Sequence, residues 1–150
     1  MIAVLQRVSG ATVDVDGATV GRCGKGLCVL LGVAREDSEA DADALAKKII
    51  NLRIFEDENG KMNRSLLDVD GEMLVVSNFT LLAAYKKGNR PDYMGAAAPD
   101  EANRLYEYFA SRSRELVPTQ TGIFGADMKL HIDNDGPVTI VMDSRILLGK

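Results

Sequence analysis

The chain has 150 residues, of which 46% are hydrophobic and 27% are charged, and its formal net charge is −4. This size and composition indicate one folded domain over residues 1–150 and exclude a multidomain protein, a disordered chain or a membrane span, which needs roughly 18 consecutive apolar residues. The acidic balance opposes sequence-blind binding along a nucleic-acid backbone, so we expect no DNA partner, and any RNA must be held locally.

The first part of the chain is predicted to be β-structure. Short strands are expected at residues 2–5 and 11–15, and Asp16-Gly17 marks a tight turn into a further strand at 18–20. Residues 27–33 are apolar at almost every position. This pattern is typical of a central strand that is covered on both faces.

A helix is predicted to follow these strands. Ser38 begins it, and Asp41, three residues later, completes a pattern typical of a capping box. Its buried face repeats at helical spacing and consists of Ala42, Leu45, Ala46, Ile49 and Leu52. Beyond the helix we expect short strands at residues 53–56 and 73–76, the first turning at Asn59-Gly60.

The rest of the chain is predicted to hold a second helix and a terminal hairpin. Asp100, after Pro99, caps this helix, and its buried face consists of Ala102, Leu105, Tyr106 and Phe109. Residues 128–133 and 138–143 are expected to pair with each other through a loop at 134–137. This order of elements predicts an α+β fold, a single domain with a mostly antiparallel or mixed, barrel-like sheet and helices packed on one side.

Ser77 and Thr80, in the segment Ser77-Asn78-Phe79-Thr80, are the first candidate site residues. In a flat strand their side chains would point to opposite faces, so a shared site requires the backbone to turn after Ser77. A strand leading into a helical turn would leave amide groups unpaired, and such amides can stabilise an oxyanion. The alternative is that Ser77 only caps a helix and Thr80 is a surface hydroxyl. Neither hydroxyl has a base nearby in sequence, so a serine nucleophile is poorly supported.

Cysteines and histidines are too few for a zinc site. Cys23 and Cys28 have no second pair, and His131 is the only histidine. A Ser/His/Asp triad would need His131 as its base. Because His131 alternates with Leu130 and Ile132, it is predicted to be an exposed strand residue.

The segment Asn134-Asp135-Gly136-Pro137 is the second candidate. It is typical of a hairpin loop, but Pro137 has no N–H to donate to a strand ladder. A Gly-Pro bond reaches the cis form at modest cost, and a cis bond would turn two successive carbonyls to the same side. Such a pair of acceptors could grip an ammonium group, and the alternative is a plain turn.

Positively charged residues give two further candidates. Lys86, Lys87 and Arg90 place three cations within five residues of an otherwise acidic chain. This segment is either a solvated loop or a small clamp for phosphate. Arg7 stands among apolar neighbours in an early strand, where it is either an edge-strand charge or a functional group.

Three segments, residues 77–81, 87–91 and 134–139, together resemble the D-aminoacyl-tRNA deacylase family, and the opening residues 1–8 are similar to that family's first strand. The resemblance covers essentially the whole chain, although the family usually has Gln at the position of Asn78. It implies a homodimeric, metal-free esterase without a cofactor. Such an enzyme removes D-amino acids wrongly attached to the 3′ end of tRNA, in the cytoplasm.

The resemblance also implies roles for the candidate residues. Amides around Asn78 and Phe79 would stabilise the oxyanion while Ser77 and Thr80 shape the pocket, with no covalent nucleophile. Gly136-Pro137 would enter the partner subunit's pocket, grip the α-ammonium and reject L-amino acids sterically. Further substrate-binding residues are Asn134, Arg7, Lys87 and Arg90.

Glycine has no Cβ to reject, so glycyl-tRNA, as formed by mischarging of tRNA(Ala), is a further expected substrate. Two other functions stay open from the residues alone. One is a non-catalytic module that binds a ligand or a protein, and the other is a hydrolase of small esters or amides that uses a hydroxyl nucleophile.

Overall fold

The computed structural model describes residues 1–150, and one long strand organises its sheet. Strand β1 (Ile2–Val15) pairs antiparallel with β3 (Gly26–Gly32) through its first half and with β2 (Ala18–Cys23) through its second half. The prediction of two separate strands is therefore wrong. The polar and glycine residues between positions 6 and 10 interrupt the apolar alternation, but the backbone stays extended because β3 pairs with β1 as far as Val8 and β8 pairs with Gly10.

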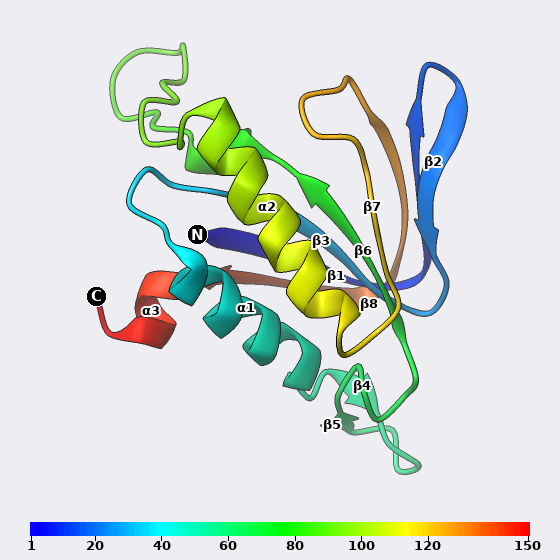
Figure 1. The fold of residues 1–150 in the computed structure, drawn as a ribbon. Coiled ribbons are helices and arrows are strands. Elements are labelled where there is room, and N and C mark those ends of the chain that lie inside the picture. The colour runs from blue at the N-terminus through cyan, green and yellow to red at the C-terminus, as the bar shows by residue number, and fades with distance from the viewer.

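The mixed, barrel-like sheet that the sequence predicts is confirmed. Strands β6 (Glu72–Ser77) and β7 (Thr119–Thr121) extend it in parallel, giving the order β2-β1-β3-β6-β7, and the sheet curls into a nearly closed barrel (Figure 1). All but one residue of β3 are buried, as expected for a strand covered on both faces. The Asp16-Gly17 turn is also present, with φ angles of 51° and 80° that match a hairpin turn of type I′.

The predicted terminal hairpin is wrong. Residues 129–143 form one strand, β8 (Lys129–Asp143), and both of its halves pair antiparallel with β1, from Lys129 opposite Asp14 to Asp143 opposite Ile2. The register shifts twice around the middle of β1, where residues 135–138 leave the regular ladder. The hairpin does not form because β1 is long enough to pair with both halves.

Two helices cover one face of the sheet (Figure 1): α1 (Glu39–Asn51) and α2 (Pro99–Arg114). The capping box of Ser38 and Asp41 is present in α1, and the predicted apolar faces of both helices are buried, except that Leu52 follows the last helical residue and is half-buried. Asp100 is not the cap of α2. That position is Ala98, because Pro99 takes the first helical position, where its missing N–H costs nothing.

The remaining elements are short. Strands β4 (Phe55–Glu56) and β5 (Met62–Arg64) form a separate hairpin around Gly60, where the sequence predicts a turn. The chain ends in α3 (Ser144–Leu148), which the sequence analysis missed. None of the helices combines the length and the hydrophobicity that crossing a membrane requires.

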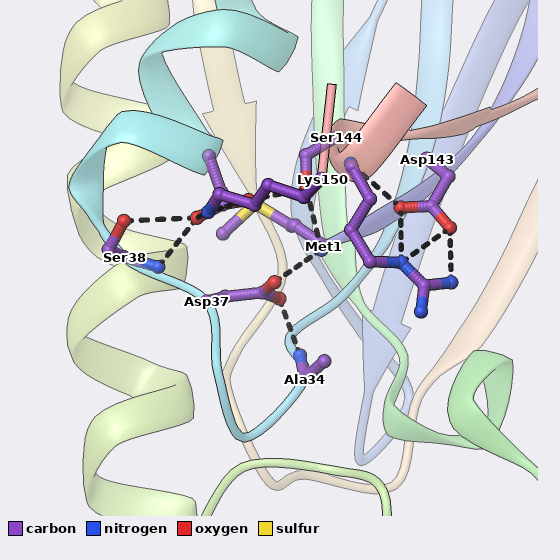
Figure 2. A network of polar contacts seen from close by, with 9 residues as sticks. Met1, Ala34, Asp37, Ser38, Asp143, Ser144 and Lys150 are labelled. Atoms are coloured by element: carbon purple, nitrogen blue, oxygen red, sulfur yellow. Dashed lines mark hydrogen bonds and ion pairs between the residues drawn. The ribbon is translucent and has the colours of Figure 1, made fainter. Parts of the chain in front are cut away.

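The two ends of the chain meet in a polar cluster, which we call the terminal cluster (Figure 2). The Met1 ammonium donates to Asp37 at 2.5 Å and to the Ser144 hydroxyl at 2.8 Å. Ser144 in turn donates to Asp41 at 2.7 Å, and Lys150 Nζ donates to the same carboxylate at 3.0 Å. The cluster joins β1, α1 and α3.

Candidate active site

The chain turns sharply where β6 ends at Ser77. Asn78 is the last extended residue, and the 3-10 helix η1 (Phe79–Leu82) begins directly after it. The turn that a site shared by Ser77 and Thr80 requires is therefore present. Ser77 does not cap this helix, because the cap position is Asn78 and its side chain makes no capping hydrogen bond.

The backbone amides at this turn differ in their availability. The Asn78 amide donates to the Leu31 carbonyl at 2.8 Å and so continues the ladder between β3 and β6. We therefore drop the expectation that this amide contributes to an oxyanion site. The amides of Phe79 and Thr80 open η1 and have no acceptor within it. The Thr80 hydroxyl donates to the side-chain oxygen of Asn78.

A pocket of about 690 Å³ opens beside the turn. Its size is within the range of about 300 to 1,000 Å³ that is typical of small-ligand sites. It lies between the ends of β3 and β6, η1, the start of α2 and the segment that leads into β8, and most of its lining is apolar. The lining includes Ser77, Asn78 and Phe79 together with Tyr93, Phe124 and Met128.

Two aromatic rings stand at the pocket next to η1. Phe79 is 57% exposed, and its ring meets that of Tyr93 edge to face, with 5.1 Å between the ring centroids. Tyr93, Phe124 and Met128 are pocket residues for which the sequence predicted no role. The only signal for Tyr93 is an aromatic residue shortly after a basic segment, and no signal in the sequence indicates the other two.

Glycine at position 32 allows η1 to lie close to β3. A Cβ at Gly32 would come within 2.5 Å of the Leu82 side chain and within 3.0 Å of the Asn78 carbonyl oxygen. A side chain at this position would therefore turn the end of the Leu82 side chain away and shift the Asn78 carbonyl by a few tenths of an ångström. This contact fixes where the Phe79 and Thr80 amides lie relative to the pocket.

The second predicted segment, residues 134–138, is fixed by hydrogen bonds from a buried arginine and from within the segment itself. Arg7 is only 5% exposed, and its guanidinium donates to the carbonyl of Asp135 at 3.0 Å and to that of Ile54 at 2.8 Å. The Asn134 side chain accepts from the Val138 amide at 3.0 Å. Because β1 is paired on both edges, Arg7 is not an edge-strand charge.

Gly136 and Pro137 lie exposed at the tip of this segment. The bond between them is cis, and the φ of Gly136 is 134°, a conformation that residues with a side chain rarely adopt. Within one chain these two residues do not line the pocket, nor do Arg7 or Asn134. Strand β8, which carries them, is separated from β6 in the sheet by β1 and β3.

The cationic segment forms a loop directly beyond η1, which we call the basic loop (residues 84–92). Its ends are tied together, because Ala84 and Asp92 exchange backbone hydrogen bonds of 2.7 and 2.8 Å. Lys86, Lys87 and Arg90 are exposed on it, and none of them lines the pocket. The residue after the loop is Tyr93 at the pocket, so the loop adjoins the candidate site.

Other chemistry-bearing residues lie away from the turn. His131 is exposed on β8, as predicted, and its ring lies 3.2 Å from the Asp14 carboxylate. Burial raises the pKa of Cys23 to about 11 and that of Cys28 to about 12, so both thiols stay protonated and are poor nucleophiles at neutral pH. No group of three or more His, Cys, Asp or Glu side chains lies together in a way that could hold a metal ion.

Solved structures share this fold. One, described as a probable eukaryotic D-amino acid tRNA deacylase, superposes with a TM-score of 0.83 over 94% of this chain and 97% of that one, and its 17% identity speaks only for the fold. Another, described as the c-Myc DNA Unwinding Element Binding Protein, gives a TM-score of 0.90 at 43% identity and covers 95% of this chain and 98% of that one. The class is therefore that of single-domain α+β proteins with the deacylase fold.

Sequence comparison narrows the class to a family. A family model described as D-Tyr-tRNA(Tyr) deacylase matches residues 4–143. A D-aminoacyl-tRNA deacylase of Persephonella marina is 55% identical over 147 residues, which are 98% of this chain and 100% of the relative, and one of Geotalea uraniireducens is 58% identical over 145 residues, 96% and 94% respectively. This chain therefore belongs to the D-aminoacyl-tRNA deacylase family of hydrolases, as its motifs indicated.

Proposed function

We propose that this protein hydrolyses the ester bond of D-aminoacyl-tRNA in the cytoplasm and releases the D-amino acid and the tRNA. The observation that carries the proposal is the turn after Ser77, which leaves the amides of Phe79 and Thr80 without an intrahelical acceptor beside an apolar pocket. An ester is already activated relative to an amide. Its hydrolysis therefore needs only a positioned water and a stabilised oxyanion.

In this mechanism the Phe79 and Thr80 amides donate to the oxyanion that forms when water attacks the ester carbonyl. The apolar pocket holds the flat base of the terminal adenosine, and Ser77 shapes its wall. The neighbouring ribose hydroxyl assists the water. Thr80 is not a covalent nucleophile, because its hydroxyl donates to the Asn78 amide oxygen, which is too weakly basic to deprotonate it.

In this proposal the enzyme selects D-amino acids by sterically excluding the side chains of L-amino acids. D- and L-amino acids carry the same groups, so the enzyme must block the side on which an L side chain projects. The exposed carbonyls around Gly136 and Pro137 would accept from the α-ammonium and close that side, while Arg7 and Asn134 hold the segment in place. Glycyl-tRNA lacks the group that would collide and is therefore also a substrate.

The proposal requires a homodimer. Within one chain Gly136 and Pro137 are exposed and do not line the pocket, so in this proposal a second copy supplies the segment. The exposed cations Lys87 and Arg90 would hold backbone phosphates of the tRNA next to the pocket.

The first test compares hydrolysis of D-tyrosyl-tRNA, L-tyrosyl-tRNA and glycyl-tRNA. We expect the D and glycyl substrates to be cleaved and the L substrate to be spared. A binding module would cleave none of them, and a generic esterase would cleave D and L alike. Thr80→Ala should lower the rate only about tenfold, which is the size of effect expected from losing one positioning contact. Abolished cleavage in a folded Thr80→Ala variant would instead show that its hydroxyl is the nucleophile.

The dimer is tested by mixing two variants that each lack D-selective cleavage. Gly32→Leu disrupts the pocket side, because its side chain must displace η1, and Gly136→Ala disrupts the selecting segment. Mixed dimers contain one intact pocket facing one intact segment, so co-refolded variants should regain D-selective cleavage. Recovery is not expected if each chain uses its own segment. Circular dichroism of each variant monitors folding, and Asn134→Ala replaces Gly136→Ala if that variant is unfolded.

A further inference from the structure

Tyr85, on the basic loop, is an aromatic residue that no role described so far uses. Its side chain is 80% exposed, although aromatic rings of this size are usually buried at least in part. It follows Ala84 directly and precedes Lys86 and Lys87. The pair of hydrogen bonds between Ala84 and Asp92 closes the loop just before Tyr85, so the backbone on which the ring stands is anchored.

The basic loop is joined to the pocket at both ends. It begins two residues after Leu82, the last residue of η1, and it ends just before Tyr93, whose ring contacts Phe79. The loop therefore offers a surface directly beside the pocket to a strand of RNA whose last nucleoside occupies it. The loop connecting η1 to α2 lies at one end of the molecule, opposite the β4–β5 hairpin (Figure 1).

Lys86, Lys87 and Arg90 on the basic loop form no ion pairs within the chain and are available to bind phosphates. On α2 the exposed Arg104 and Arg112 are paired with carboxylates, whereas no ion pair of the chain involves the lysines or the arginine of the loop. The one carboxylate of the loop, Asp92, accepts from the Met94 amide at 2.6 Å, which occupies it in shaping the backbone. An exposed ring among unpaired cations is the pattern that binds single-stranded RNA by stacking.

We propose that Tyr85 is the stacking platform for the unpaired cytosine that precedes the terminal adenosine of tRNA, and that Lys86 neutralises the phosphate between these two nucleotides. The proposal rests on the proposed function, since it assumes that the pocket holds the terminal adenosine. It makes Tyr85 a positioning residue. The ring contributes to binding of the strand and takes no part in cleavage of the ester.

The test uses Tyr85→Ala and Tyr85→Phe with two substrates, a D-tyrosyl ester of the trinucleotide CCA and one of adenosine alone. We expect Tyr85→Ala to raise KM for the trinucleotide ester about tenfold with kcat unchanged, because one stacked base is lost. Its kinetics on the adenosine ester should equal those of the wild type, and Tyr85→Phe should behave as the wild type on both. Met62→Ala, which removes an exposed side chain from β5, is the matched control.

Binding of an uncharged, fluorescently labelled CCA trinucleotide separates this proposal from the proposed function. If the wild type cleaves neither ester but Tyr85→Ala still weakens trinucleotide binding about tenfold, the stacking role stands and the deacylase proposal fails. Equal effects of Tyr85→Ala on both esters, or none on trinucleotide binding, would overturn the stacking role. A Tyr85→Ala variant that sediments as a monomer would instead place the ring in a contact between two copies of the chain.

Discussion

The terminal cluster and the turn after Ser77 both contain polar groups beside buried strands. They differ in whether these groups have hydrogen-bond partners. In the terminal cluster the Met1 ammonium and the Asp41 carboxylate have partners inside the chain. At the turn, the amides of Phe79 and Thr80 open a helix without an acceptor in it. Polar groups satisfied within the chain stabilise the fold, whereas groups left open next to a pocket are available to a substrate.

The largest expected effect of a single substitution is at Asp41, in the terminal cluster. Its side chain is 1% exposed and accepts from Ser144, Lys150 and Ser38. Replacing it by alanine leaves the buried Ser144 hydroxyl without its acceptor and removes the partner of the more exposed Ser38 and Lys150 donors, so we expect Asp41→Ala to lower the free energy of unfolding by about 3 kcal/mol. Urea denaturation measures this. The control is Asp43→Ala on the same helix, whose exposed ion pair with Arg112 should contribute less than about 1 kcal/mol.

The same carboxylate predicts how stability depends on pH. Burial alone would raise the pKa of Asp41, but hydrogen bonds from Ser144, Lys150 and Ser38 outweigh it and hold the pKa well below its usual value. The contribution is therefore complete above the unfolded-state pKa of about 3.9 and is lost as the pH falls through the folded-state value. The wild type should lose stability below about pH 4, more steeply than Asp41→Asn. Parallel pH profiles of the two proteins would contradict the assignment.

A substitution at the turn after Ser77 is expected to affect kcat more than the free energy of unfolding. Gly32→Ala forces the Leu82 side chain and the Asn78 carbonyl away from β3, which shifts the amides that follow. Misplaced donors should lower kcat for D-tyrosyl-tRNA by tenfold or more, on the order of what one oxyanion contact contributes. Gly10→Ala is the control, because a Cβ there meets only an ordinary contact of 3.6 Å. Equal kcat values for the two variants would show that the turn is not the catalytic element.

The smallest expected effect concerns the basic loop. Removing its cations with Lys87→Ala and Arg90→Ala should raise KM for D-tyrosyl-tRNA several-fold and make it depend less on salt, since fewer phosphates are neutralised. Steady-state kinetics at two or more salt concentrations measure both quantities. Lys61→Ala, an exposed cation near the β4–β5 hairpin, should change neither. If all three variants respond alike to salt, the effect is one of net charge and not of a phosphate site.

Local patterns allowed much of the fold to be predicted. The Asp16-Gly17 turn, the capping box at Ser38 and the apolar stripe of each helix depend on neighbouring residues, and all are present. The partner of β8 could not be predicted. A local reading pairs its halves with each other, whereas the true partner, β1, is more than a hundred residues away in sequence.

The candidate site also has parts that local sequence patterns could indicate and parts that they could not. The turn after Ser77 could be inferred as a condition, because two hydroxyls three residues apart can share a site only if the strand ends between them, and the structure has this turn. Phe124 and Met128 reach the pocket only through the packing of the segment before β8 against the sheet, which leaves no local pattern. The occupied amide of Asn78 was also missed, since its acceptor, Leu31, is on a different strand.

The buried guanidinium of Arg7 has a consequence for how two copies would meet. It joins the exposed segment at Asp135 to the carbonyl of Ile54, beyond the end of α1, entirely within one chain. The segment therefore has its shape before any second copy arrives, and association need not pay the entropy of ordering it. In a dimer built as proposed, the segment that distinguishes D- from L-amino acids would be rigid within each subunit. Substitutions at the subunit contact would then move this segment relative to the partner's pocket without changing its conformation.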